Sequence, residues 1–315
     1  MTSRYLFNRI GQALLVLWAA FTISFVLLQA MPGDAILIKF QNPELGLTPQ
    51  QIAEIRASYG ADGPLWLQYI ESIGDFLTGN FGYSVQAGVP VSASLAAHLP
   101  VTLKLATFGL LAAVVLAIAI AYLSSLAPFA WLRSAIRSIP SLFVSIPTFW
   151  LGIMLIQIFS FRLKLVPVIN PEPWQELILP VATLAVPISA PLAQVLVRNI
   201  DDVLTRAFVA VARAKGATRT WVLWRHVAGN ALLPTLTIAG VLFGELIAGA
   251  VVTETVFGLN GVGGLTERAV GAQDAAVLQA IVVLSAAAFV VINLIVDLLY
   301  PMLDPRLRTR SGATA

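Results

Sequence analysis

The chain has 315 residues, of which 58% are hydrophobic and only 11% are charged, and its mean hydropathy is +0.85. Soluble domains carry about 25% charged residues, so this chain has too few polar side chains to cover a surface in water. Its composition therefore predicts a membrane protein. The formal net charge of +3 is too small for this length to indicate a nucleic-acid partner. The lack of cysteine excludes disulfides, thiolate metal sites and a cysteine nucleophile.

Six segments are apolar and long enough to cross a bilayer, which takes about 20 residues in a helix. The first run carries no charge from Ile10 to Gly33. It is longer than the apolar part of a signal peptide, and no small-residue cleavage site follows it, so we expect a retained span. The sequence thus predicts an all-α membrane protein in which residues 1–315 form one transmembrane domain. The expected spans are about 10–32, 100–126, 138–161, 177–197, 230–255 and 275–300.

The distribution of basic residues predicts the orientation of these spans, because cytoplasmic loops collect Lys and Arg. With the N-terminus inside, the inner segments hold most of the arginines, whereas residues 34–98 hold six acidic and two basic residues. Residues 33–98 are therefore expected to form a long periplasmic loop. An even number of spans then places both the N- and the C-terminus in the cytoplasm.

Two short helices are expected within the periplasmic loop. Thr48 is a candidate N-cap, with Pro49 in the first helical position and Gly60 as the stop. The second helix has one apolar face, so it could lie on the bilayer surface, pack on a partner or pack within the chain. That face is expected to carry Trp66, Tyr69, Ile70, Ile73 and Leu77.

Residues 198–229 form a basic insert between the fourth and fifth spans. From Arg198 onward, apolar residues recur at helical spacing, which predicts an amphipathic helix that Gly216 ends in the left-handed conformation. A short second helix follows, and Pro234 marks the entry to the next span. One face of that second helix is expected to carry Trp221, Trp224 and Ala228. Such a helix–turn–helix either docks another protein or binds anionic lipid.

The insert resembles the cytoplasmic loop of ABC importer permeases. It contains "ARAKG" at 212–216, "RH" at 225–226 and "NALLP" at 230–234. Further segments similar to the dipeptide, oligopeptide and nickel permease family occur in the expected order. They are "MPGD" 31–34, "GNFGYSVQAGVPV" 79–91, "LPVTLKLA" 99–106, "SIPTFWLG" 145–152, "ETVFGLNGVGG" 254–264 and "NLIVDLLYPMLDPRLR" 293–308. The chain thus resembles the inner-membrane component of binding-protein-dependent transport systems.

This resemblance implies the type I ABC importer permease fold in a bacterial inner membrane. It implies a heterodimer with a second homologous permease, two cytoplasmic ABC ATPases docked on the pair, and an extracytoplasmic binding protein that delivers substrate. Peptides are the usual cargo of the family, and nickel complexes or another small solute are the alternative. Contact with an ATPase is implied for Ala212, Arg213, Ala214, Lys215, Gly216, Ala217, Thr218, Arg219, Trp221, Arg225 and His226.

The chain departs from the family at two positions. Ala210 stands where the family motif has its glutamate, so one carboxylate contact to the ATPase is missing, and Glu245 stands where a small residue is usual. Glu245 is expected midway through the fifth span, where a carboxylate costs about 2.5–3.5 kcal/mol. It either bonds a neighbouring helix, contacts the partner permease or lines the translocation path. Its face is expected to carry Val241, Gly244, Ala248 and Gly249.

The translocation path and its outer gate are expected to include a further set of residues, mostly glycines. The glycine-rich segment 258–264 is expected to form a tight periplasmic loop, because it follows an apolar span and no Lys-Ser/Thr comes after it. The residues assigned to the path or gate are Glu245, Gly249, Glu254, Gly258, Gly261 and Gly263.

The sequence predicts no catalytic site in this chain. ATP hydrolysis needs a phosphate-binding loop of the form G-x-x-x-x-G-K-[ST], and no Gly-Lys dipeptide occurs. ATP and magnesium are therefore expected on separate ATPase subunits, with no cofactor or metal on this chain. His98 and His226, the two histidines, are expected on opposite sides of the membrane, which argues against a zinc site.

An intramembrane hydrolase and a secondary transporter are the alternatives to transport driven by ATP. An intramembrane hydrolase needs paired catalytic residues within its spans, whereas the expected intramembrane ionisable residues are Glu245 and Asp297. A secondary transporter usually shows internal repeats and interrupted helices, and no repeat is evident in the sequence. The sequence therefore favours an ABC permease.

Overall fold

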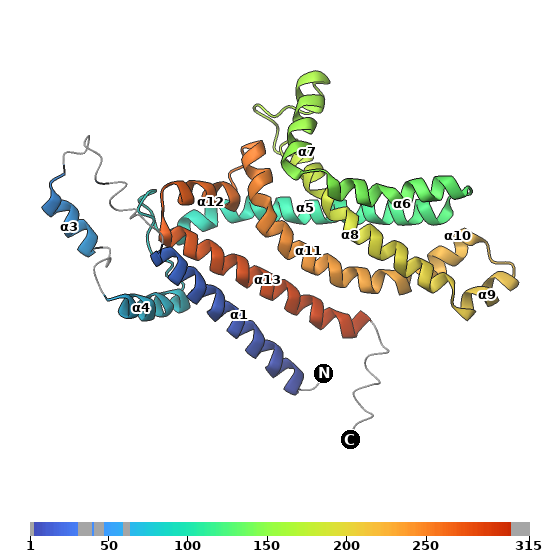
Figure 1. Cartoon of the computed structure of the whole chain (residues 1–315), viewed down its shortest axis with the longest axis horizontal. Coiled ribbons are helices and arrows are strands. Elements are labelled where there is room, and N and C mark those ends of the chain that lie inside the picture. The colour runs from blue at the N-terminus through green and yellow to red at the C-terminus, as the bar shows by residue number, and fades with distance from the viewer. Residues whose placement is uncertain (1–2, 31–39, 41–46, 59–63, 304–315) are drawn as a thin grey trace. The chain divides into compact units, whose positions relative to one another are not determined.

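The structure is a computed structural model that describes residues 3–30, 40, 47–58 and 64–303 (Figure 1). Its elements are helices, and within this described part the one β pairing is an isolated bridge between Tyr83 and Pro90. The all-α prediction is confirmed. The helices are α1 (Ser3–Ala30), α3 (Pro49–Ser58), α4 (Leu65–Thr78), α5 (Val91–Leu126), α6 (Ala130–Ser145), α7 (Thr148–Leu155), η2 (Ile156–Arg162), α8 (Ile178–Leu204), α9 (Ala207–Ala214), α10 (Arg219–Val222), η3 (Leu223–Val227), α11 (Ala228–Phe257), α12 (Val262–Gly271) and α13 (Ala275–Leu303).

Four single helices in the described residues are long and apolar enough to cross a membrane. They are Phe7–Leu28 of α1, α5, α8 and Ala275–Ile295 of α13. Two bent pairs also pass the same test, one made by α6 with the segment Thr148–Arg162 and one made by Arg219–Leu232 with Thr237–Ile247. If each bent pair is one span, the number of spans is the predicted six.

The third expected span, 138–161, is divided by a bend of 100° between α6 and the helix that follows it. Pro147 causes the break, because a proline disfavours the helical conformation of the residue before it. Ile146 accordingly has extended dihedral angles, φ −88° and ψ 119°, and Pro147 stands at φ −61° just before α7 begins. A charge-free run in the sequence therefore contains two helix directions.

The contacts of the chain cluster into two compact units. The first contains residues 103–257 and 291–303, and the second contains the described residues within 3–102 together with residues 258–290. In the first unit, α8 packs on α6 and α11. Its core is rich in small buried side chains, which allow transmembrane helices to approach closely. They include Ala113, Ala117, Ala185, Ala193 and Ala239.

The second unit is held together by a buried carboxylate as well as by apolar packing. Asp274 is 1% exposed and precedes α13. Its Oδ2 accepts a hydrogen bond from Ser84 Oγ at 2.6 Å and from the backbone N–H of Gln86 at 3.2 Å. This carboxylate therefore ties the loop between α4 and α5 to the start of α13. The apolar core beside it includes Val91, Leu95, Val262, Leu265 and Val277.

The helix expected after Thr48 is present as α3. The Thr48 hydroxyl accepts from the Gln51 N–H at 3.3 Å, and the Gln51 side chain accepts from the Thr48 N–H at 2.8 Å. This reciprocal pair is a capping box, and it confirms Thr48 as the N-cap. Gly60, the expected stop, lies outside the described residues.

Candidate docking site

The basic insert begins as part of a longer helix. We expected one amphipathic helix from Arg198 to the glycine turn, and this is wrong, because α8 continues to Leu204 and a separate helix, α9, begins at Ala207. The Thr205 hydroxyl donates to the Asp202 carbonyl at 2.8 Å, and Arg206 is extended at φ −72° and ψ 147°. Threonine side chains compete in this way with helical backbone bonds, and the helix changes direction there.

The turn after α9 has the geometry that the sequence predicts. Gly216 has φ +88°, its N–H donates to the Arg213 carbonyl at 2.9 Å, and the Ala217 N–H donates to the Ala212 carbonyl at 3.1 Å. This pair of bonds is a Schellman motif, which needs a left-handed residue at its centre. A Cβ built on Gly216 meets nothing within 4 Å, so a larger residue would strain the backbone without clashing.

The second helix of the insert is continuous with the fifth span. The Thr218 hydroxyl accepts from the Trp221 N–H at 3.3 Å and caps α10. The π-helical turn η3 then leads directly into α11, and Pro234 lies inside that helix. The segments Arg219–Leu232 and Thr237–Ile247 on either side of Pro234 meet at a bend of 59°. A π turn takes an extra residue, which shifts the faces on either side of it. This explains why Ala228 is buried whereas Trp221 and Trp224 are exposed, contrary to the predicted common face.

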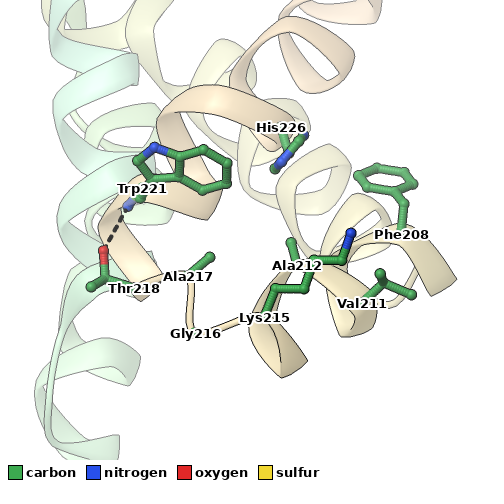
Figure 2. A pocket seen from close by; sticks show the side chains of 9 residues that line it. All are labelled: Phe208, Val211, Ala212, Lys215, Gly216, Ala217, Thr218, Trp221 and His226. Carbon is green, nitrogen blue, oxygen red and sulfur yellow. Dashed lines mark hydrogen bonds between the residues drawn. The ribbon is translucent and has the colours of Figure 1, made fainter.

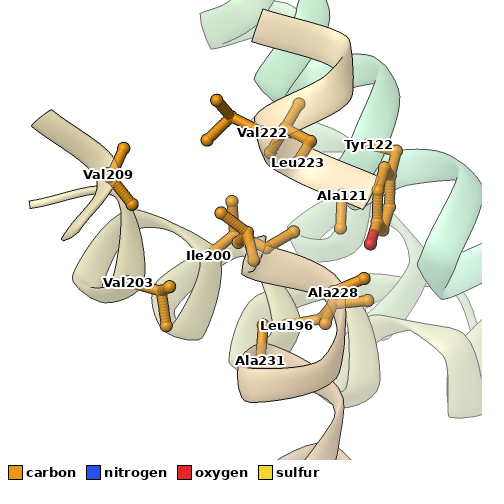
Figure 3. Close-up of a cluster of buried hydrophobic side chains, with 11 residues drawn as sticks. Ala121, Tyr122, Leu196, Ile200, Val203, Val209, Val222, Leu223, Ala228 and Ala231 are labelled. Atoms are coloured by element: carbon orange, nitrogen blue, oxygen red, sulfur yellow. The ribbon is translucent and has the colours of Figure 1, made fainter. Parts of the chain in front are cut away.

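A buried apolar cluster fixes the insert to the ends of two spans (Figure 3). Val209 of α9 and Val222 of α10 pack with Leu196 and Ile200 of α8 and with Ala121 of α5. Each fully buried Val or Leu side chain contributes about 1.5–3 kcal/mol. Since several such side chains share this cluster, residues 207–227, which we call the docking element, are firmly attached to α5 and α8.

The docking element encloses a groove of about 620 Å³ (Figure 2). Its lining residues are Phe208, Val211, Ala212, Lys215, Gly216, Ala217, Thr218, Trp221 and His226. The His226 ring meets the edge of the Trp221 ring at 5.0 Å between centroids and lies 6.0 Å from the Phe208 ring. The groove thus lies between the rings of Trp221 and His226 on one side and α9, which carries Phe208, on the other.

The surface around the groove is positively charged. Arg213, Lys215, Arg219 and Arg225 are exposed, and the sequence contains no acidic residue between Asp202 and Glu245. An apolar groove with a basic rim suits a protein partner that inserts an apolar side chain and presents carboxylates around it.

The residues expected at the translocation path do not share one surface. On α11, Glu245 and Gly249 are exposed, whereas Glu254 is 0% exposed. Glu254 is nine residues after Glu245, which places it on the opposite side of the helix. Gly244 is buried, whereas Val241 and Gly249 are exposed, and the side chain of Ala248 lies outside the described residues. The narrow face expected around Glu245, suited to close packing or to a pore wall, stays a prediction.

The remaining gate candidates belong to the second unit. Gly258 has φ +65°, and Gly261 precedes the first turn of α12. Gly263 is buried within that turn, so the expected loop 258–264 is partly helical. Among the described residues, no group of three or more His, Asp or Glu side chains is placed to hold a metal ion.

Comparison with protein families identifies this architecture. Residues 76–309 match the binding-protein-dependent transport system inner membrane component, and residues 2–106 match the N-terminal region of such membrane components. The first match covers well over half of the chain. The chain belongs to this permease family.

The permease is similar to other transport proteins over nearly its whole length. It is 34% identical over 312 residues to the "Probable peptide ABC transporter permease protein y4tP" of Sinorhizobium fredii, which covers 96% of this chain and 99% of that protein. It is 32% identical over 304 residues to the "Glutathione transport system permease protein GsiC" of Escherichia coli strain K12, with coverage of 96% and 98%. These relatives support the peptide and oligopeptide branch of the family.

A solved structure supports the fold of the permease. The inward-facing MetNI methionine ABC transporter superposes with a TM-score of 0.57 at 18% identity, over 67% of this chain and 96% of that chain. The permease therefore has the type I ABC importer fold and is a multi-pass protein of the bacterial inner membrane. The family is a transport component and not a catalytic subunit, and an importer of this kind works with ATPase and binding-protein partners.

Sequence reasoning found most of the groove of the permease, but not all of it. Ala212, Lys215, Gly216, Ala217, Thr218, Trp221 and His226 line it, as a connected set. Arg213, Ala214, Arg219 and Arg225 lie in the same element but outside the lining. Phe208 and Val211 were missed as site residues, although their helical spacing with Ala212 marks them as one face of α9.

Proposed function

We propose that this permease forms one half of the translocation path for di- and oligopeptides and that its docking element receives a cytoplasmic ATPase. The observation that carries the second part is the groove of about 620 Å³ in an element that a buried cluster attaches to α5 and α8. A docked partner that moves can then move these spans, because the docking element cannot slide separately from them. The basic rim favours an ATPase surface that carries carboxylates.

The peptide assignment rests on the relatives. One is named as a probable peptide permease and another as a glutathione permease, and glutathione is itself a small peptide derivative. Peptides delivered by an extracytoplasmic binding protein are therefore the proposed substrate. Nickel complexes or another small solute are the alternative that the family resemblance leaves open.

The rest of the assembly follows from the same proposal. A second, homologous permease completes the path as a heterodimer, and two ATPase subunits bind ATP and magnesium, so this chain needs no cofactor. Both termini and residues 198–229 lie in the cytoplasm, and residues 33–98 lie in the periplasm. Glu245, Gly249, Glu254, Gly258, Gly261 and Gly263 belong to the path or its gate.

The test is the ATPase activity of the assembled transporter in proteoliposomes with its binding protein. Dipeptides and tripeptides are expected to stimulate ATP hydrolysis several-fold, and a nickel complex is not. If the nickel complex stimulates ATP hydrolysis and the peptides do not, the substrate is a nickel complex and the peptide proposal is wrong. A binding protein that binds peptides without stimulating ATP hydrolysis would contradict the proposed role of the permease.

A further inference from the structure

Helix α4 carries an apolar face that the described residues of its own unit leave exposed. Trp66, Ile70 and Leu77 are 66%, 59% and 84% exposed. Glu71 and Asp75 lie on the opposite side of the helix, as their positions along a 3.6-residue turn require. An amphipathic helix with this arrangement has one face suited to hydrocarbon and one suited to water.

The adjoining edge of α4 packs on α1 through aromatic rings. The Tyr69 ring lies 5.9 Å from the Phe21 ring and 5.3 Å from the Phe25 ring, and the Phe76 ring lies 5.0 Å from that of Phe21. The Tyr69 hydroxyl is hydrogen-bonded to Thr22 Oγ1 at 2.7 Å. The one polar atom of this edge thus has a partner inside the contact and needs no water.

This contact places α4 against the apolar stretch of α1. Phe21 and Phe25 lie inside the described part of that stretch, Phe7–Leu28, about 5–10 Å before Leu28 at 1.5 Å per residue. On the same stretch of α1, Ile23, Val26 and Leu27 are exposed, and apolar side chains in a membrane span are suited to contact with lipid. A helix held at this level cannot keep its free apolar face in bulk water.

The contact also indicates that α4 crosses α1. Tyr69 and Phe76 are seven residues apart on α4, yet both lie against Phe21. Parallel helices would spread such contacts over a similar length of both helices, whereas here they span only Phe21–Phe25 on α1. A helix that crosses a span in this way can lie along the membrane plane.

We propose that α4 is an interfacial anchor, with Trp66, Ile70 and Leu77 inserted among the lipid acyl chains on the side of the membrane where α1 ends. Its contact with α1 lies within the apolar stretch of that span, and amphipathic helices bury their apolar faces roughly 5–10 Å deep, at the boundary between headgroups and acyl chains. Trp66 is the residue type that favours this boundary. The anchor is independent of the substrate and of ATPase docking.

Site-directed spin labels test this depth in the full-length chain, assembled with its transport partners in proteoliposomes of phosphatidylethanolamine and phosphatidylglycerol. The chain has no native cysteine, so Ile70→Cys and Leu77→Cys each carry one label. Glu71→Cys is the matched control, because it is on the same helix but on its polar side. Collisions of each label with oxygen, which dissolves in hydrocarbon, are compared with collisions with chromium oxalate, which stays in water.

The ratio of oxygen to chromium oxalate collisions is expected above one at Ile70 and Leu77 and below one at Glu71. A ratio below one at both apolar positions would overturn the proposal, because the face would then lie in water. Low collision rates with both reagents at both positions would also overturn it, because a protein partner would then cover the face. Leu77 is so exposed that its replacement leaves the fold intact, which keeps the test valid if Ile70→Cys assembles poorly.

Discussion

The indole ring of Trp224 stacks on the phenol ring of Tyr122, with 4.6 Å between the ring centroids and 28° between their planes. Trp224 belongs to η3 of the docking element, and Tyr122 belongs to the buried face of α5. The stack therefore adds an aromatic contact to the aliphatic cluster through which the docking element is attached to a membrane-spanning helix.

Trp224→Ala is expected to lower the free energy of unfolding by about 0.5–1.5 kcal/mol through loss of this stack. Tyr122→Phe is the control. It keeps the ring, and the Tyr122 hydroxyl is buried without a hydrogen-bond partner in the described structure, so its removal should cost nothing. Thermal unfolding of the purified protein in detergent measures the stability of both variants. A loss of stability in Tyr122→Phe equal to that in Trp224→Ala would show that the hydroxyl, and not the stack, matters.

Gly216→Val is expected to uncouple transport from ATP hydrolysis while the protein still inserts into the membrane. A β-branched residue at φ +88° costs about 1–3 kcal/mol of backbone strain, which would distort the turn of the docking element. Gly216→Asn should retain most transport, because asparagine tolerates the left-handed conformation. Peptide uptake and ATPase activity are measured on the same vesicles, and normal uptake in Gly216→Val would refute the proposed role of the turn.

Cysteine labelling tests the proposed orientation. Thr220→Cys in the docking element should react with a membrane-impermeant maleimide only from the cytoplasmic side, and Gln86→Cys only from the periplasmic side. Both side chains are exposed, and the lack of native cysteine removes background labelling. Labelling of Thr220→Cys from the periplasm would reverse the topology and exclude ATPase docking at this groove.

Gly152→Ala is expected to destabilise the first unit by about 1–3 kcal/mol through overpacking. A Cβ at Gly152 would lie 3.2 Å from Phe257 Cε2 and 3.2 Å from Val256 Cγ1, so α7 and α11 would have to move apart. Gly229→Ala in α11 is the control, since a Cβ there meets nothing within 4 Å. Unfolding midpoints are compared, and equal midpoints would mean that the α7–α11 contact is looser than the structure has it.

Glu245→Gln is expected to reduce uptake of peptides with a free amino group by roughly tenfold, which corresponds to about 1.4 kcal/mol. The side chain of Glu245 is exposed on α11, and a carboxylate within a span usually faces a cavity or a partner. Uptake of the same peptides with a blocked amino group is the control and should not change. If both kinds of peptide are carried at the wild-type rate, Glu245 has no electrostatic role in the path.

The sequence predicts the helices of this protein well and their interruptions poorly. Long apolar runs identify the spans because a bilayer demands them, and the segment that includes "ARAKG" identifies the docking element. The bend at Pro147 and the break at Thr205 depend on single residues inside otherwise helical patterns. The π turn η3 leaves no such local signal, because it is stabilised by how Val222, Leu223 and Val227 pack on α5 and α8.

Part of the candidate groove could be predicted from the sequence, and part could not. Its turn residues follow from local chemistry, since Gly216 and Thr218 end one helix and cap the next. Phe208 comes from the earlier part of α9, and its distance to His226 depends on the packing of α9 against η3. Only the tertiary structure shows that residues far apart in the sequence share one surface.

The carboxylate of Asp274 joins segments of the permease that lie far apart in the sequence. Its donors, Ser84 and the Gln86 backbone, are about 190 residues earlier and fall where the two family matches, residues 2–106 and 76–309, overlap. A shortened protein that began at α5 would leave this acid buried without those donors, a situation that costs several kcal/mol for an ionised group. The loop before α5 is therefore an integral support of the start of α13, and engineering that exchanges this loop between permeases must carry the Ser84–Asp274 pair as one unit.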